Sequence, residues 1–160
     1  MKASIRALCV MLALGLGASQ APASEPRPFD NQSWGELARA KRDRPMIVHF
    51  WSLTCGICLG ELVDWAEFAG KHPGVRLVLV NWDDRVQDAK RINATLAKNG
   101  LSKVENWALQ SDFEEKVRFN IDREWMGELP YTQLFKRGGE VKAFAGEADF
   151  NELEAWAAAR

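Results

Sequence analysis

Two kinds of hydrophobic pattern alternate along the chain, and they predict both strands and helices. Met46–Trp51 and Val75–Val80 are apolar at nearly every position, which predicts strands buried on both faces of a sheet. Further β-rich runs predict shorter strands at Trp107–Leu109, Tyr131–Lys136 and Val141–Ala145. Gly138-Gly139 separates the last two runs and predicts that they form a hairpin.

Apolar residues at helical spacing predict five helices between these strands. Three of them begin at a sequence typical of a helix N-terminus: Ser33 with Glu36, Ser111 with Glu114, and Asp149 with Glu152. The first of these is expected to run to about Lys41. The other two helices are predicted over residues 55–70 and 86–98, each ending near a glycine.

The order of these elements predicts an α/β fold. Strands that alternate with helices, followed by an antiparallel hairpin, imply a central mixed sheet with helices on both faces. By length the chain holds one such domain, which we place at residues 33–160.

The first residues have the three-part pattern of a secretory signal. Lys2 and Arg6 precede the uncharged segment Ala7–Ala18, and Ala21-Pro22-Ala23 supplies small residues for cleavage. We therefore predict a signal peptide over residues 1–23, a flexible leader over residues 24–32, and a periplasmic or otherwise exported protein. The apolar segment is shorter than the ~20 residues of a membrane span. An uncleaved N-terminal anchor facing the exported side is the alternative, and only it would place the protein at a membrane.

Charge excludes some partners. The chain has 21 Lys+Arg and 22 Asp+Glu, and loss of Lys2 and Arg6 leaves a net charge of about −3. No basic segment indicates nucleic acid. Cleavage also removes Cys9, so Cys55 and Cys58 become the only thiols.

Cys55-Gly56-Ile57-Cys58 follows the first buried strand and carries the strongest functional signal. A helix that begins at Cys55 would place its sulfur at unpaired backbone N–H groups and the positive end of the helix dipole, which favours the reactive thiolate. A disulfide between these residues closes too small a loop to add much stability. The pair is therefore interpreted as redox-active, although two thiolates also suit Cu(I).

Several segments together resemble the thioredoxin-like superfamily, from about Ser33 to the C-terminus. The segment 48–58, VHFWSLTCGIC, is similar to the strand and active site of that family. Gly127-Glu128-Leu129-Pro130 is similar to its cis-proline loop, and Gly138-Gly139 and Gly146 to the glycines that follow. With the signal peptide, the chain is most similar to exported TlpA/ResA-type thiol–disulfide reductases, which often have a Glu at the position of Glu61.

The resemblance implies a thioredoxin fold and a role for each residue of the site. Cys55 would be the nucleophile and Cys58 the resolving thiol. Leu129 and Pro130 would bind a substrate strand, and Trp51 would cover the site. An ordinary strand-starting proline and a purely packing tryptophan are the alternatives at two of these positions.

His49 and Glu61 are the candidates for a proton relay. His49 stands where thioredoxin has an Asp that exchanges a proton with the second thiol, and an exposed histidine titrates near neutral pH. The alternatives are a core histidine satisfied by local hydrogen bonds and a glutamate solvated on the helix surface.

The function that follows is an exported thiol–disulfide oxidoreductase, which we expect to reduce disulfides in other exported proteins. An upstream membrane or periplasmic dithiol donor would re-reduce it, and neither a cofactor nor a bound metal is expected. The alternatives are an oxidase, a Cu(I) carrier or metallochaperone using Cys55 and Cys58, and a non-catalytic binding module. Thr54, Gly56-Ile57 and His49 differ from the usual family residues, so the direction of electron transfer stays open.

Overall fold

Six strands form one mixed sheet in the computed structural model, which describes residues 25–39 and 43–159. The strands are β1 (Arg27–Phe29), β2 (Met46–Trp51), β3 (Arg76–Asn81), β4 (Glu105–Leu109), β5 (Tyr131–Phe135) and β6 (Val141–Ala145). Their order across the sheet is β1-β4-β3-β2-β5-β6. The first four are parallel, whereas β5 runs antiparallel to both β2 and β6.

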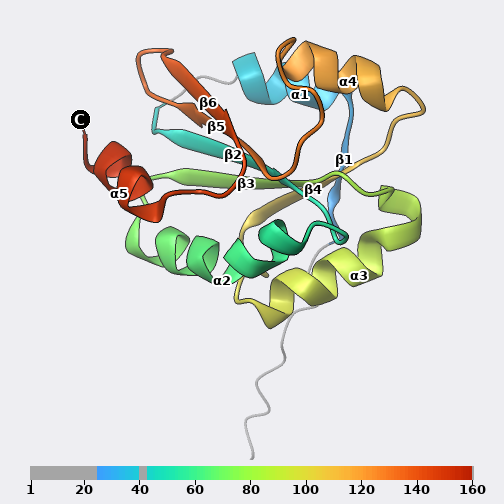
Figure 1. Ribbon diagram of the computed structural model, residues 1–160, viewed down its shortest axis with the longest axis horizontal. Coiled ribbons are helices and arrows are strands. Elements are labelled where there is room, and N and C mark those ends of the chain that lie inside the picture. The colour runs from blue at the N-terminus through green and yellow to red at the C-terminus, as the bar shows by residue number, and fades with distance from the viewer. Residues whose placement is uncertain (1–24, 40–42, 160) are drawn as a thin grey trace, which may run out of the picture.

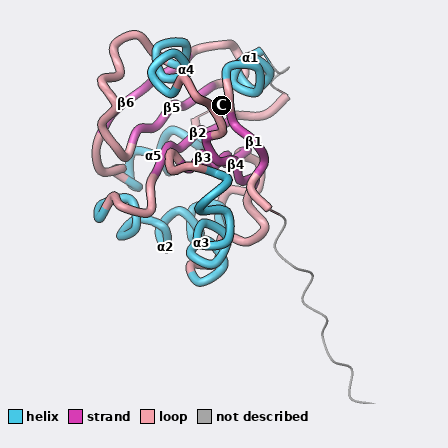
Figure 2. The backbone as a smooth tube through the Cα atoms, turned by 90° about the vertical axis from the view of Figure 1, so that its right-hand side faces the viewer, coloured by secondary structure: helices cyan, strands magenta, loops and turns pink. Residues whose placement is uncertain are grey.

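Five helices cover both faces of this sheet (Figure 1). They are α1 (Asn31–Arg39), α2 (Gly56–Lys71), α3 (Arg85–Lys98), α4 (Glu114–Ile121) and α5 (Phe150–Ala158). Helices α1 and α4 lie on one face, and α2 and α3 lie on the other, as the turned view in Figure 2 also shows. The predicted α/β class, mixed sheet and two-sided helical cover are confirmed.

Strand β2 lies in the interior of the sheet, between β3 and β5, and all six of its residues are buried. The continuous apolar run predicted this position, because a strand covered by helices on both faces has no side facing water. His49 is the one polar residue in β2 and is buried with the others. The chain leaves β2 at Trp51 and reaches the first residue of α2 five positions later, so the cysteines lie at the C-terminal end of a fixed strand.

Helix α1 begins earlier than predicted. Its N-cap residue is Asp30, whereas the sequence pattern predicted Ser33. Asp30 Oδ1 accepts a hydrogen bond from Ser33 N at 2.8 Å, and Asp30 N donates to Ser33 Oγ at 2.6 Å. This reciprocal pair is a capping box in which Ser33 occupies the third helical position. The predicted flexible leader over residues 24–32 and the domain start at residue 33 are therefore wrong, because β1 and the start of α1 lie within residues 27–32.

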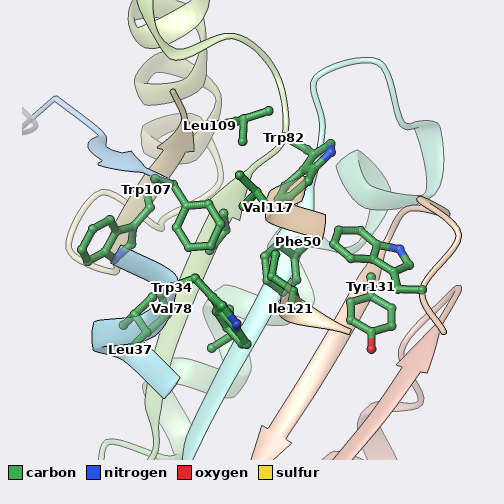
Figure 3. Close-up of a cluster of buried hydrophobic side chains, with 14 of the residues drawn as sticks. Trp34, Leu37, Phe50, Val78, Trp82, Trp107, Leu109, Val117, Ile121 and Tyr131 are labelled. Atoms are coloured by element: carbon green, nitrogen blue, oxygen red, sulfur yellow. The ribbon is translucent and has the colours of Figure 1, made fainter. Parts of the chain in front are cut away.

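Strand β1 belongs to the fold because it pairs with β4 and buries Phe29. Arg27, Pro28 and Phe29 are in register with Trp107, Ala108 and Leu109. Phe29 is 0% exposed and contacts the rings of Trp34, Phe50, Trp82 and Trp107 at centroid distances of 6.0–6.5 Å. Figure 3 shows the core on this face of the sheet, where Trp34, Phe50 and Tyr131 project into the same cluster.

Helix α4 starts at Glu114 instead of Ser111. Ser111 Oγ accepts from Phe113 N at 3.1 Å, which makes a local turn and no cap. The Glu114 carboxylate, which the predicted cap would direct to the backbone of Ser111, accepts from Trp82 Nε1 at 2.5 Å instead. The caps of α3 and α5 are regular: Asp84 accepts from Gln87 N, and Asp149, as predicted, accepts from Asn151 N and Glu152 N.

Candidate redox site

Cys55 and Cys58 form a disulfide at the start of α2. The S–S distance is 2.04 Å and the two Cα atoms are 5.3 Å apart. Cys55 is the N-cap residue of α2, with extended backbone, and its sulfur accepts a hydrogen bond from Cys58 N at 3.1 Å. A backbone N–H at the positive end of a helix stabilises negative charge on that sulfur. The sequence-based expectation that the helix begins at the first cysteine is met.

The two cysteines differ in exposure. Cys55 is half-buried, whereas Cys58 is 0% exposed and packs with Leu62 and Trp65 beneath the helix. Gly56 and Ile57, between them, face solvent, and Ile57 is 52% exposed. Only Cys55 can be approached by a large partner, so the geometry separates an accessible thiol from an interior one.

The Leu129–Pro130 segment lies at the same end of the sheet as the cysteines. Its peptide bond is cis, the isomer that the resemblance implies. Pro130 immediately precedes β5, whose Tyr131 is in register with Phe50 of β2. Leu129 and Cys55 both pack against the hydrophobic cluster that contains Cys58. The carbonyl of Pro130 accepts from Gly146 N at 2.8 Å, which ties this segment to the end of β6.

The aromatic core holds the segment before Pro130 in place. Trp125 stacks on Tyr131 with a centroid distance of 4.5 Å and an interplanar angle of 9°. Trp125 Nε1 donates to the carbonyl of Glu128 at 2.8 Å, and the Tyr131 hydroxyl donates to Asp122 at 2.5 Å. The loop that carries Leu129 is therefore anchored from both of its ends.

His49 and Glu61 meet in the interior, behind Cys58. His49 Nδ1 lies 3.0 Å from the hydroxyl oxygen of Thr132, and His49 Nε2 lies 4.0 Å from Glu61 Oε2. Glu61 is only 4% exposed, and its other carboxylate oxygen accepts from Ala148 N at 2.5 Å. The sequence-based alternative of a solvated glutamate is thus wrong, because the helix face that carries Glu61 packs against the segment before α5.

Burial favours the neutral form of both groups. Complete removal from water lowers the pKa of His49 to about 3, because burial disfavours the charged imidazolium. Burial raises the pKa of Glu61 above its usual range, and the Ala148 N–H bond opposes this only in part. His49 therefore does not titrate near neutral pH, contrary to the sequence-based expectation, and Glu61 is the group of the pair that holds a proton more readily.

Several buried polar atoms beside this pair have no hydrogen-bond partner among the described residues. They are His49 Nε2, Trp51 Nε1, Glu61 Oε2 and Trp65 Nε1. The Trp65 ring lies 4.6 Å from the His49 ring, and its indole is near the Glu61 carboxylate without meeting hydrogen-bond geometry. Trp51 is fully buried in the cluster that contains Cys58, a position that favours the packing alternative, and a substrate-binding role for it stays a prediction.

The sequence did not predict a polar network around the residues that precede Cys55. Asp83, two residues after β3, accepts from Leu53 N at 2.6 Å and from the Ser52 hydroxyl at 2.9 Å. Asn81 Nδ2 also donates to Asp83, at 3.0 Å. The signal was present in the chain: polar residues follow both β2 and β3, and the C-terminal ends of adjacent parallel strands meet at one edge of a sheet.

The described part of the chain has neither a cluster of metal-ligating side chains nor a helix that could span a membrane. Within residues 25–39 and 43–159, no group of three or more His, Cys, Asp or Glu side chains is placed to hold a metal ion. In the same ranges no helix is long and apolar enough to cross a membrane. The predicted signal peptide over residues 1–23 lies outside the described residues.

Comparison with known proteins gives likeness in structure only. No protein-family model matches the sequence, and no curated protein matches it. Among solved structures, a secreted Mycobacterium tuberculosis disulfide oxidoreductase homologous to E. coli DsbE is 18% identical, with a TM-score of 0.59 over 76% of this chain and 85% of that one. StoA from Bacillus subtilis is 25% identical, with a TM-score of 0.56 over 73% and 84% of the two chains.

A third solved structure is also similar in fold and low in sequence identity. A putative thiol:disulfide interchange protein DsbE from Chlorobium tepidum is 20% identical, with a TM-score of 0.54 over 72% of this chain and 78% of that one. The chain therefore has the thioredoxin fold, with its own cysteine pair, Cys55 and Cys58, at the start of α2.

Proposed function

We propose that the protein is an exported thiol–disulfide oxidoreductase that reduces disulfides in other exported proteins. The observation that carries the proposal is the asymmetry of the cysteine pair: Cys55 is half-buried at a helix N-terminus, and Cys58 is fully buried behind it. An accessible, stabilised thiolate beside an interior thiol suits attack followed by resolution.

The reaction transfers two electrons from the dithiol to the target. The Cys55 thiolate attacks one sulfur of the target disulfide, and the other target sulfur leaves as a thiolate that takes up a proton. The resulting mixed disulfide is then attacked at Cys55 by the Cys58 thiolate, which releases the second target thiol. Cys55 and Cys58 end as a disulfide, and a dithiol donor of the exported compartment restores them.

The cis Leu129–Pro130 segment supports a site for the target chain. An extended target segment would pair with the backbone beside Pro130, as peptides add to exposed backbone edges in other proteins. Proline has no N–H, so no backbone donor from position 130 competes for the sulfurs. Ile57 supplies exposed apolar surface between the two cysteines.

We assign the proton transfer of the second step to Glu61, with His49 in a supporting role. Cys58 and Glu61 are three residues apart on α2, so their side chains share one helix face. A carboxylate whose pKa is raised by burial is a stronger base, which suits removal of the proton from the Cys58 thiol before that thiol attacks. His49 Nε2 lies 4.0 Å from Glu61 Oε2, beside this carboxyl. His49→Ala is expected to shift the pH profile of thiol exchange, and an unchanged profile would exclude the histidine.

Export is supported by the signal-like pattern of residues 1–23 and by the secreted M. tuberculosis neighbour. We propose a periplasmic or otherwise exported location and exported disulfide-containing proteins as partners. In the native cell, the Cys58→Ser variant should accumulate mixed disulfides with its targets, and their identification tests both partners and compartment.

Insulin reduction tests the activity itself. Wild-type protein should reduce insulin with a small dithiol as donor, Cys55→Ser should be inactive, and Cys58→Ser should stop at the mixed disulfide. Equal rates in all three proteins would refute the assigned roles. A reduction potential near about −270 mV supports the reductant, whereas one near about −120 mV would identify an oxidase.

Copper is the competing ligand for the same sulfurs. Anaerobic titration of the reduced protein with Cu(I), in the presence of a competing chelator, separates the two functions. Because Cys58 is fully buried, we expect disulfide reduction with weak Cu(I) retention. Tight Cu(I) binding without insulin reduction would favour the carrier.

A further inference from the structure

The segment between β2 and Cys55 is held by a hydrogen-bond network that ends on Asp83. Cys55 N donates to the carbonyl of Ser52 at 3.3 Å, which closes a turn over Ser52–Cys55. Asp83 Oδ2 accepts from Leu53 N within this turn at 2.6 Å, and Asp83 Oδ1 accepts from the Ser52 hydroxyl at 2.9 Å. A single carboxylate thus fixes both the backbone and a side chain of the turn that presents Cys55.

Asn81 holds that carboxylate in its orientation. Asp83 N donates to Asn81 Oδ1 at 2.9 Å, and Asn81 Nδ2 donates to Asp83 Oδ2 at 3.0 Å. Asn81 is fully buried at the end of β3, beside Trp51 in the register of the sheet. The position of Asp83 is therefore set by the sheet and not by a flexible loop.

The hydroxyl groups of Ser52 and Thr54 form a directed chain toward Asp83. Ser52 Oγ lies 2.8 Å from Thr54 Oγ1 and also accepts from Thr54 N at 3.0 Å. The carboxylate accepts hydrogen bonds only, so the one hydrogen of Ser52 points to Asp83. The Thr54 hydroxyl must then donate to Ser52. The hydrogen of Thr54, the residue next to the nucleophile, is in this way directed away from the Cys55 sulfur.

Asp83 also brings a negative charge to the redox turn. In the described ranges 25–39 and 43–159, no Lys, Arg or His side chain forms an ion pair with it. A like charge near a thiol disfavours its thiolate. The charge of Asp83 and the hydroxyl chain therefore both disfavour the Cys55 thiolate. They oppose the helix N-terminus, which stabilises that thiolate.

We propose that Asp83 is a positioning residue that holds the Ser52–Thr54 turn and biases the Cys55–Cys58 pair toward the disulfide. A less stable Cys55 thiolate makes the dithiol a stronger electron donor. This role of Asp83 rests on the proposed function, because a bias toward the disulfide is what a reductant requires.

The test measures the cysteine pair itself and needs no protein substrate. In glutathione buffers the reduced pair gives two electrons and two protons to glutathione disulfide, which becomes two glutathione thiols while Cys55–Cys58 closes. In Asp83→Asn the charge is lost, and an amide nitrogen replaces one acceptor oxygen. When this nitrogen faces Ser52, it donates a hydrogen bond to the Ser52 hydroxyl oxygen. The Ser52 hydroxyl can then donate to Thr54, and the hydroxyl hydrogen of Thr54 becomes free to point elsewhere.

The expected result for Asp83→Asn is an equilibrium constant shifted about tenfold toward the dithiol at pH 8, equivalent to about 30 mV for two electrons. The pH profile of Cys55 alkylation should move to lower pH. The equilibrium shift should shrink as the pH falls below the midpoint of the alkylation profile, because a protonated thiol carries no charge for Asp83 to repel. The other titratable groups beside the pair, His49 and Glu61 with nearby Glu147, are left unchanged.

Asp84→Asn is the matched control. Asp84 is the adjacent residue and caps α3 through Gln87 N, and among the described residues it has no hydrogen bond or ion pair with Ser52–Cys55. It should leave both the equilibrium constant and the alkylation profile at wild-type values. A folded Asp83→Asn variant with the properties of Asp84→Asn would overturn the proposal.

Ser52→Ala provides a second test should Asp83→Asn fail to fold. It keeps the charge but breaks the hydroxyl chain, so a smaller shift of about threefold in the same direction is expected. No shift in Ser52→Ala would then overturn the proposal. Failure of the proposed function is a different result, namely wild-type protein that exchanges with glutathione but does not reduce insulin.

Discussion

His49 and Thr132 lie directly opposite each other on β2 and β5, and His49 Nδ1 is 3.0 Å from the Thr132 hydroxyl oxygen. Both residues are fully buried. The contact joins the strand that leads to Cys55 with the strand that follows Pro130, so one hydrogen bond links the two halves of the redox site.

Replacement of Thr132 by valine should destabilise the protein. The buried His49 nitrogen would lose its partner, and an unsatisfied buried polar group costs about 1–3 kcal/mol. Urea unfolding of the oxidised protein measures this loss in the free energy of unfolding. Thr132→Ser keeps the hydroxyl and should restore most of the stability. Equal losses in both variants would show that the methyl group, and not the hydrogen bond, matters.

Glu61 should make stability depend on pH. Its pKa is raised in the folded protein, so its contribution is complete at pH values below its ordinary pKa of 4.5 and is lost as the pH rises through the raised value. Glu61→Gln keeps an oxygen for Ala148 N and cannot ionise. Between pH 4 and 8 the free energy of unfolding of the wild type should therefore fall relative to that of Glu61→Gln. Parallel curves for the two oxidised proteins would contradict the assignment.

Ile57 should matter for protein targets and not for small ones. It is 52% exposed between the cysteines, and a target that covers an isoleucine gains about 1.5–3 kcal/mol from its burial. Ile57→Ser is expected to reduce kcat/KM for insulin about tenfold and to leave exchange with glutathione disulfide unchanged. Val141→Ser is the control, since Val141 is 48% exposed on β6 and pairs with Phe135, at the end of β5 opposite Pro130. A loss of insulin reduction in Val141→Ser alone would place the contact surface elsewhere.

Phe29 should be essential for stability although it lies close to the start of the fold. Deletion of a buried phenylalanine side chain costs about 3–5 kcal/mol, because a cavity remains among the rings around it. Phe29→Ala should therefore lower the urea midpoint sharply. Phe113 is 70% exposed, and Phe113→Ala should change the free energy of unfolding by no more than about 0.5 kcal/mol.

The sequence predicts the parts of the structure whose signals are local. The apolar run of β2, the cysteine at the start of α2 and the proline before β5 each carry their information within a few residues. Glu61 was harder, because a glutamate on a helix is usually solvated and its partner, Ala148, is far away in the chain. Strand β1 was missed for a similar reason: three residues with a proline form a strand only because β4 lies beside them.

The same limit applies to Asp83 and to the misplaced start of α4. Asp83 becomes part of the redox site only when β3 lies beside β2, so its role depends on sheet register. The Ser111 sequence has the spacing of a cap, but Trp82 captures the Glu114 carboxylate that such a cap would use. Tertiary contacts, which local spacing does not contain, decided these positions.

The pairing of β1 with β4 also bears on how the chain is made. Synthesis delivers Phe29 first, yet its partner strand is complete only after Leu109. At about 5–20 residues per second, this strand waits on the order of ten seconds for the neighbour that will cover it. During that time its aromatic side chain and backbone edge are open to other proteins. The beginning of the domain is thus the part of the nascent chain to which a chaperone has the longest access.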